Sequence, residues 1–444
     1  MTPARLLRLA HLVDCVSSHG PRLVHNVVCR ALICAVIGCG IVTAPLLLSA
    51  SVAWAVDQNQ GSETVRPEVG NPLQAAQELI KGQKYKAALA KIQEADSAKD
   101  KTPYERYVID RLRATAATGA GDVELAVKSF ESAIASGRVS STEKLKMMEA
   151  SASLYYRAKD YPDAIAWASR YRSEGGTGEE MHRLLIQAYY LNNDFTKAQT
   201  ELRSEIQADE SARRAPPEDR LQLLASCYSK QPDMSGYAAT LEKLVAYYPK
   251  KDYWTELIYR IETKPGFSSH LGLDVYRLKV ALGLPSTAGE FVEMTELALQ
   301  AGFPAEAKSI VDRGFAVGAL GSGPDADREK RLRDLATKSA TQDQRSLGQG
   351  EDEAAVAAKD GNALVNTGFA YVARGQFQRG IELLDQGIRK GGLKRPEEAK
   401  LHLGIAYLRA GQKEQAVRVF KTVQGADGAA DLARLWIIYA TRQA

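Results

Sequence analysis

The sequence predicts an all-α protein in which antiparallel helix pairs follow one another along the chain. Three observations support this fold class. From Asn71 onward the apolar residues recur with the period of a helix, and no convincing period-two alternation indicates a strand. A short turn containing Gly, Asn or Asp recurs between these helical segments. An alanine follows each turn, and these alanines return at intervals of 38, 38 and 34 residues, at Ala88, Ala126, Ala164 and Ala198.

Length and composition exclude several classes of protein. The chain has 444 residues, of which 45% are hydrophobic and 25% are charged, so it is too apolar to be disordered throughout. Its length is enough for two or three ordinary domains. The 58 basic and 54 acidic residues leave a formal net charge of only +4, which gives no electrostatic reason to expect a nucleic acid as partner.

The first segment has the pattern of an export leader, and residues 1–55 are predicted to be a signal peptide. Two arginines precede an uncharged run, and Ala53 and Ala55 end that run as a small-x-small cleavage site. The segment before the arginines is longer than usual, which an over-extended start would explain. Two alternatives stay open: lipidation at Cys39, or an uncleaved helix that anchors the protein in the inner membrane.

The remaining chain is predicted to fall into four parts. Residues 56–70 are polar and form a flexible lead-in, and residues 71–317 form an N-terminal superhelix that begins with four consecutive repeats. Residues 318–360 begin with three glycines and a proline and form an irregular or charged helical connector. Residues 361–444 form a C-terminal repeat block with a capping helix. A continuous solenoid with one irregular pair is the alternative.

The clearest repeat lies in the C-terminal block. Gly404 and Tyr407 are three residues apart in its first helix, and Ala416 and Phe420 are four residues apart in its second helix. This pattern resembles the tetratricopeptide repeat (TPR) family, and it implies an α-solenoid, a right-handed superhelix of antiparallel helix pairs. A small residue in each helix lets the two helices approach closely while the large residue fills the remaining gap. The preceding repeat carries the same spacing 36 residues earlier, at Gly368 and Tyr371.

The resemblance also implies which residues face a concave groove formed by the first helices. In the third, fourth and fifth repeats these positions are occupied by Ser153, Tyr156, Arg157, Arg183, Gln187, Tyr190, Ser226 and Lys230. Tyrosine and arginine are the residue types that often dominate binding energy, because each offers a large contact area with a polar end. The alternative for Tyr156 and Tyr190 is that they only pack between repeats.

Residues for catalysis or metal binding are not found in any recognisable pattern. The histidines that follow the leader, His182, His270 and His402, lie in separate segments without a second histidine at helical spacing. Cys227 stands at helical spacing beside apolar residues, so it is expected to be a buried, unreactive thiol. We therefore predict no catalytic residue, no metal and no cofactor.

The sequence accordingly predicts a non-catalytic scaffold or adaptor of the bacterial cell envelope, located in the periplasm. Its partners are expected to be envelope proteins or extended peptides bound in the groove. No nucleic acid is expected, and a membrane is expected only through an uncleaved leader or a membrane-bound partner. An accessory glycan- or peptidoglycan-binding factor of a polysaccharide pathway is one alternative. A self-associating structural protein is the other, with an apolar run around Trp436 either capping the last repeat or offering a docking face. The oligomeric state stays open.

Overall fold

The computed structural model describes residues 63–285, 287–346 and 351–442, and these residues form helices and no strand. The predicted signal peptide, with Ala53 and Ala55, lies outside the described residues. Contacts divide the described chain into two compact units, residues 63–214 with 226–233, and residues 215–225 with 234–442. Helix α10 (Glu218–Lys230) contributes residues to both units. The all-α fold class is confirmed.

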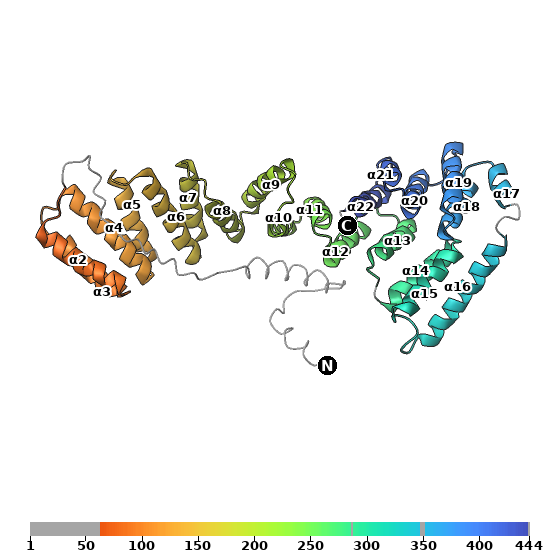
Figure 1. Ribbon diagram of the computed structural model, residues 1–444, viewed down its shortest axis with the longest axis horizontal. Coiled ribbons are helices and arrows are strands. Elements are labelled where there is room, and N and C mark those ends of the chain that lie inside the picture. The colour runs from red at the N-terminus through yellow and green to blue at the C-terminus, as the bar shows by residue number, and fades with distance from the viewer. Residues whose placement is uncertain (1–62, 286, 347–350, 443–444) are drawn as a thin grey trace. The chain divides into compact units, whose positions relative to one another are not determined.

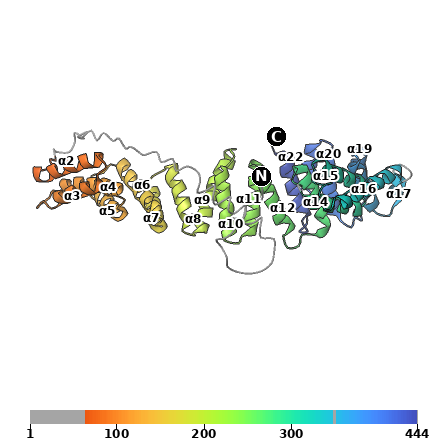
Figure 2. The ribbon, with the colours of Figure 1, turned by 90° about the horizontal axis from the view of Figure 1, so that it is seen from below.

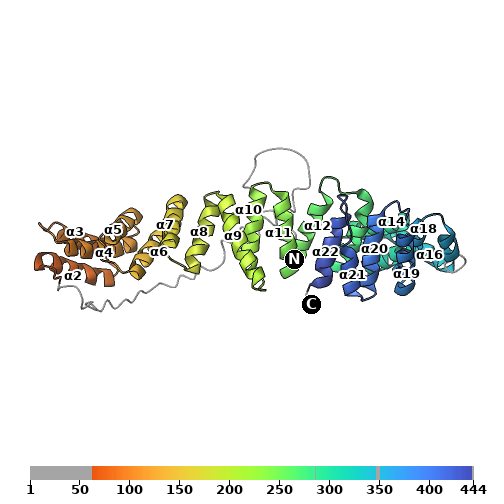
Figure 3. The same cartoon turned by 90° about the horizontal axis from the view of Figure 1, so that it is seen from above.

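The first unit consists of helix pairs in chain order, coloured orange to yellow-green in Figure 1. The pairs are α2 (Pro67–Lys81) with α3 (Tyr85–Asp96), α4 (Pro103–Ala120) with α5 (Val123–Ala135), α6 (Ser141–Arg157) with α7 (Tyr161–Ser173), and α8 (Glu179–Leu191) with α9 (Phe195–Ser211). Each pair packs on the next, and the first helices α6 and α8 also contact each other directly (Figure 3). These four pairs are the four consecutive repeats that the sequence predicts.

The turns between the two helices of these pairs share one backbone conformation and one spacing. One turn residue has a positive φ, and a fully buried alanine follows five residues later in the second helix. Gly121, with φ 79°, precedes Ala126 in this way, and Lys159, with φ 62°, precedes Ala164. The same spacing links Gln83 to Ala88, Asn193 to Ala198, Gly302 to Ala307, Gly375 to Gly380, and Gly411 to Ala416. The left-handed residue ends the first helix, and the small residue lets the second helix return against it.

The first helix begins inside the segment that the sequence predicts to be a flexible lead-in. Helix α2 starts at Pro67, and Val69 is fully buried. Arg66 fixes this start because its guanidinium donates hydrogen bonds of 2.9 Å to both carboxylate oxygens of Glu105 on α4. In the described part of this segment, residues 63–70, the helix start is held by the pairing of Arg66 with the buried Glu105 and by the burial of Val69, neither of which is evident from composition.

The second unit contains the remaining helices. They are α11 (Met234–Tyr247), α12 (Lys251–Glu262), the short 3-10 helix η2 (Ser269–Leu271), α13 (Gly272–Leu282), α14 (Ala288–Gln300), α15 (Pro304–Ala316), α16 (Ala326–Ser346), α17 (Glu351–Ala357), α18 (Asn362–Ala373), α19 (Phe377–Lys390), α20 (Pro396–Arg409), α21 (Lys413–Phe420) and α22 (Ala429–Thr441). Helix α16, in the stretch predicted to be an irregular or charged connector, packs along α15 and α14. The shared turn conformation and spacing place α14 with α15, α18 with α19, and α20 with α21 as further pairs.

The end of the chain returns to the start of this unit. Helix α22 contacts α11 and α13, and the helices at the C-terminal end lie beside the green segment in all three ribbon views (Figures 1, 2 and 3). Lys264 pairs with Asp431 at 2.9 Å, and the backbone N–H of Ser268 donates to the carbonyl of Asp427 at 2.8 Å. Residues 361–442 therefore belong to the same compact unit as α11 to α15.

Close packing defines the two C-terminal pairs. A Cβ atom on Gly404 would lie 2.3 Å from the ring of Phe420, and one on Gly368 would lie 2.8 Å from the backbone nitrogen of Leu384. Phe420 is 1% exposed, and it stacks on Trp436 of α22, which is 3% exposed. Trp436 of α22 is thus buried against the last helix pair, α20 with α21. Within the described residues, no helix combines the length and apolarity needed to cross a bilayer.

Candidate functional site

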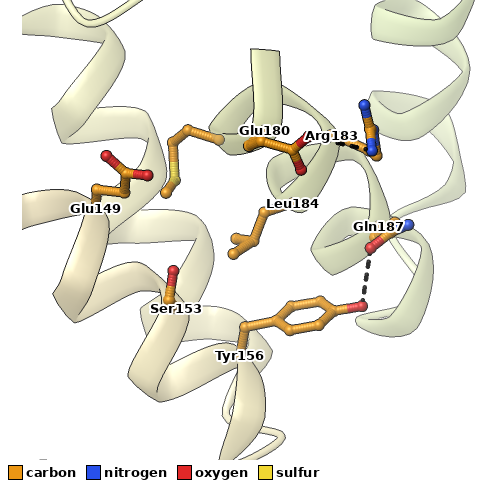
Figure 4. Close-up of a pocket in the computed structure, with 8 residues that line it drawn as sticks. Glu149, Ser153, Tyr156, Glu180, Arg183, Leu184 and Gln187 are labelled. Atoms are coloured by element: carbon orange, nitrogen blue, oxygen red, sulfur yellow. Dashed lines mark hydrogen bonds and ion pairs between the residues drawn. The ribbon is translucent and has the colours of Figure 1, made fainter. Parts of the chain in front are cut away.

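Four of the residues that the sequence assigns to the groove meet in the first unit, on α6 and α8. Ser153 and Tyr156 from α6, with Arg183 and Gln187 from α8, line one hollow of about 220 Å³ (Figure 4). Four residues that the sequence analysis did not single out complete the lining: Glu149, Glu180, Met181 and Leu184. We call this space the α6–α8 hollow.

Two tyrosines connect successive first helices. The hydroxyl of Tyr156 donates to Oε1 of Gln187 at 3.1 Å, and the hydroxyl of Tyr190 shares a hydrogen bond of 2.8 Å with Oγ of Ser226 on α10. Burial raises the pKa of Tyr156, so its hydroxyl keeps its proton and stays a donor at neutral pH. These two hydrogen bonds each connect one first helix to the first helix of the next repeat.

The rings of the same tyrosines are also held from the side. Tyr156 meets Tyr161 edge-on with ring centroids 5.9 Å apart, and Tyr190 meets Phe195 edge-on at 5.5 Å. Such contacts add stabilisation beyond simple burial. The rings of both tyrosines thus pack within their own helix pair, their hydroxyls bond to the next repeat, and Tyr156 in addition lines the hollow.

The predicted groove cations are more exposed than the tyrosines. Arg183 forms ion pairs along its own helix, at 3.8 Å with Glu179 and 3.4 Å with Glu180. Arg157 and Lys230 are exposed at the ends of their helices and do not line the α6–α8 hollow. Of the eight predicted groove residues, the structure thus brings four together in one hollow and joins Tyr190 to Ser226 beside it.

A second, wider hollow of about 560 Å³ lies at the turns of the two C-terminal pairs. Its lining includes Gln376, Phe377 and Gln412. Arg379 is its charged member, and this side chain already pairs with Asp352 at 2.8 Å and Glu382 at 3.3 Å. The charged member of this hollow is therefore already paired within the protein.

The second unit contains a buried charge cluster that the sequence patterns do not predict. The guanidinium of Arg277 on α13 donates to Asp274 at 2.7 Å and to Glu306 on α15 at 2.7 Å. His402 on α20 lies 2.9 Å from the same Asp274 oxygen, and Arg409 donates to the other oxygen of Glu306 at 2.9 Å. The cluster therefore joins α13, α15 and α20.

An aromatic ring forms one wall of this cluster. The guanidinium carbon of Arg277 lies 4.4 Å from the ring centre of Phe369, and the ring of His402 stacks on the same phenyl group at 4.3 Å. Arg277 is 4% exposed and Phe369 is fully buried. A cation over an aromatic face is attracted most strongly when water is excluded, as it is at this position.

For the carboxylates of this cluster, the ion pairs lower the pKa by more than burial raises it. Burial by itself would raise the pKa of Glu306, but Arg277 and Arg409 lower it to about 2. Burial likewise opposes ionisation of Asp274, yet His402 and Arg277 hold the pKa of its carboxyl well below the ordinary range. Both carboxylates are therefore ionised at neutral pH, and Arg277 supplies the positive charge between them.

Part of the cluster has the composition of a metal site. Ligand atoms of Asp274, Glu398 and His402 lie within 4.8 Å of one another. A guanidinium nitrogen of Arg277, however, lies 2.7 Å from the Asp274 oxygen and 3.1 Å from Nε2 of His402. The positive charge that a metal ion would bring is thus already supplied by the protein at the shared ligand atoms. We interpret the cluster as a structural network.

Local sequence patterns carry only a weak signal for this cluster. Asp274 and Arg277 are spaced to pair along one face of α13, as many exposed helical pairs are. His402 lies 125 residues further along the chain than Arg277. Nothing in the local sequence indicates that the return of the chain brings α20 onto this face and removes the charges from water.

Comparison with known protein families matches two stretches of the chain, residues 111–179 and 367–431, to a tetratricopeptide repeat family model. One stretch lies in each unit. The chain contains tetratricopeptide repeats. The repeat family expected from Gly404, Tyr407, Ala416 and Phe420 is thereby confirmed, and repeats of this kind generally support protein–protein interaction.

Solved structures resemble the chain only distantly. A TPR protein from Parabacteroides merdae is 13% identical, covers 76% of this chain and 98% of its own, and gives a TM-score of 0.30. The TPR2AB domain of yeast Sti1, in a complex with pHSP90, is 12% identical over 68% of this chain and 100% of its own, with a TM-score of 0.22. Yeast Tom70 is 11% identical over 84% and 95%, with a TM-score of 0.22. These scores are too low for the likenesses to carry any conclusion, and no curated protein matches the chain.

Proposed function

We propose that this protein is a non-catalytic scaffold that binds partner proteins, or extended peptide segments of them, along the first helices α6 and α8. One observation carries this proposal. Ser153, Tyr156, Arg183 and Gln187, assigned to a groove from their repeat positions alone, line a single hollow between α6 and α8. These positions were assigned from the repeat pattern without knowledge of the hollow, and they lie together on one surface, as residues of a binding groove should.

The charges of the described residues support a scaffold rather than an enzyme. The buried ionisable groups around Arg277 form ion pairs with one another. Burial raises the pKa of the Cys227 thiol to about 12, so this side chain is a poor nucleophile at neutral pH. Aromatic contacts to Tyr161 and Phe195 also favour peptide binding over sugar stacking, because they hold each groove tyrosine edge-on against the second helix of its own pair.

The proposed location is the periplasm of a bacterial cell, and the proposed partners are proteins or peptides of the cell envelope. The supporting feature is the leader pattern of residues 1–55, with its cleavage site at Ala55. N-terminal sequencing of protein recovered from the periplasmic fraction tests this proposal. A first residue of Val56 supports export and cleavage. Recovery with the membrane fraction, with the leader retained, supports the inner-membrane anchor instead.

Site-specific photocrosslinking in the producing cell tests the scaffold function. A photoreactive amino acid replaces Arg183, which is half-exposed and lines the α6–α8 hollow. The matched control replaces Arg203, which is exposed on α9, the second helix of the same pair. We expect a crosslinked partner protein at Arg183 and none at Arg203. Equal capture at both positions, or no capture at Arg183, contradicts the proposal.

A further inference from the structure

We propose that the α6–α8 hollow receives the side chain of a lysine or arginine from an extended segment of the partner. This inference rests on the proposed function and specifies the chemistry of the partner at that surface. It follows from the size of the hollow, from one carboxylate that lacks a counter-charge, and from the apolar side chains beside it.

The size of the hollow suits one long side chain. Its volume of about 220 Å³ is below the range of about 300–1,000 Å³ that is typical of sites for small-molecule ligands. A cavity of about 150 Å³ already accepts a benzene-sized guest. The α6–α8 hollow is therefore a pocket for a single residue of a segment that lies along the groove.

The charges of the side chains that line the hollow favour a positively charged residue of the partner. In the described part of the chain, the carboxylate of Glu149 forms no ion pair or hydrogen bond. Figure 4 shows it at the edge of the hollow, across from Glu180. Arg183 is the cation of the lining, and it is already paired with Glu180 at 3.4 Å and with Glu179 at 3.8 Å. One negative charge thus remains uncompensated.

The other lining groups fit the stem and the donors of a basic side chain. Met181 is 3% exposed and Leu184 is half-buried, and Leu184 points into the space between the helices (Figure 4). Lysine and arginine bury their aliphatic stems against apolar surface while the charged end stays polar. The hydroxyl of Ser153, which has no hydrogen-bond partner among the described residues, adds an acceptor near Glu149.

An acidic side chain fits the same space poorly. It would lie against both Glu149 and Glu180, and its one attractive contact would be Arg183, whose guanidinium is held by two carboxylates. Like charges placed together in an interface oppose binding of the wrong partner. The hollow therefore discriminates between basic and acidic segments.

Selection from a library of random peptides of about twelve residues, displayed on phage, tests this inference with the purified full chain as target. Parallel selections use Glu149→Gln and the matched control Glu131→Gln, which removes an exposed glutamate on α5 outside the hollow. The most enriched peptide is then synthesised, and fluorescence anisotropy measures its Kd for all three proteins and for Glu149→Lys. Thermal unfolding confirms that each variant is folded.

We expect enrichment of lysine or arginine at one peptide position with the wild-type chain and with Glu131→Gln. The selected peptide should bind Glu149→Gln about fivefold more weakly, as for a half-exposed ion pair, and Glu149→Lys more weakly still. Added salt should reduce the difference in Kd for the peptide between the wild-type chain and Glu149→Gln, because salt screens the ion pair.

Two results overturn the inference. If peptides are selected without a basic position, or bind Glu149→Gln as well as wild type, the groove still binds peptides but the assigned partner chemistry is wrong. If no peptide is enriched over the library background and crosslinking at Arg183 also captures nothing, the proposed function itself is wrong.

Discussion

Replacement of Arg277 by methionine measures how strongly the buried charge cluster holds the second unit together. The change removes a guanidinium that is 4% exposed and that donates to Asp274 and Glu306, both at 2.7 Å. Removing one partner of a buried ion pair costs about 3–5 kcal/mol, because the remaining charge is left in the interior. Arg409 still pairs with Glu306 at 2.9 Å, so we expect the lower end, about 3 kcal/mol. For a unit of this size that loss lowers Tm by about 6–12 °C.

The pH dependence gives the same prediction a second readout. In the wild-type chain the pKa of Glu306 is lowered from 4.5 to about 2, so its contribution to stability is complete above about pH 4.5 and is lost between pH 4.5 and 2. In Arg277→Met, Asp274 and Glu306 each lose one positively charged partner, so their carboxylates take up protons more readily as the pH falls, which relieves the cost of burying their negative charge. The difference in stability between the two proteins should therefore shrink between about pH 7 and pH 5.

Circular dichroism at 222 nm follows thermal and urea unfolding of both proteins at the two pH values. Arg328→Met is the matched control, because it removes an exposed arginine that pairs with Glu296 at 3.2 Å in the same unit. Exposed pairs contribute about 1 kcal/mol or less. The predicted role of Arg277 is refuted if Arg277→Met lowers the free energy of unfolding no more than Arg328→Met does. It is also refuted if Arg277→Met lowers it by the same amount at both pH values, because the carboxylates are then not held as buried charges by Arg277.

Three further predictions concern packing, backbone strain and the thiol. Gly404→Ala should lower the free energy of unfolding by about 1–3 kcal/mol, because its Cβ would lie 2.3 Å from Phe420; unchanged urea unfolding would contradict this contact. Lys159→Gly should stabilise the first unit by about 1 kcal/mol, because Lys159 has a φ of 62°; a lower Tm than wild type would contradict strain at this turn. In protein that lacks residues 1–55, and with them the other four cysteines, the thiol of Cys227, with its pKa raised to about 12, should react with Ellman's reagent only after unfolding; rapid reaction of the native protein would contradict its burial.

The repeats could be predicted because their determinants are local. Helical periodicity, the left-handed turn residue and the small residue five positions later all lie within one helix pair. The positions Ser153, Tyr156, Arg183 and Gln187 followed from the repeat register, and the structure places all four in one hollow. Their partners were less predictable: the bond from Tyr156 to Gln187 spans 31 residues, and the role of Glu149 depends on which charges lie near it.

The sequence by itself determined that this protein is a series of antiparallel helix pairs, two stretches of which match tetratricopeptide repeats, since each pair is specified by residues close together in the chain. The tertiary structure alone decided where α2 begins, through the pairing of Arg66 with Glu105, and how the chain returns onto α13. The return leaves Arg277, Asp274 and His402 buried together. Whether a charged residue is solvated or buried depends on segments far away in the sequence, and the local pattern of charges looks the same in both cases.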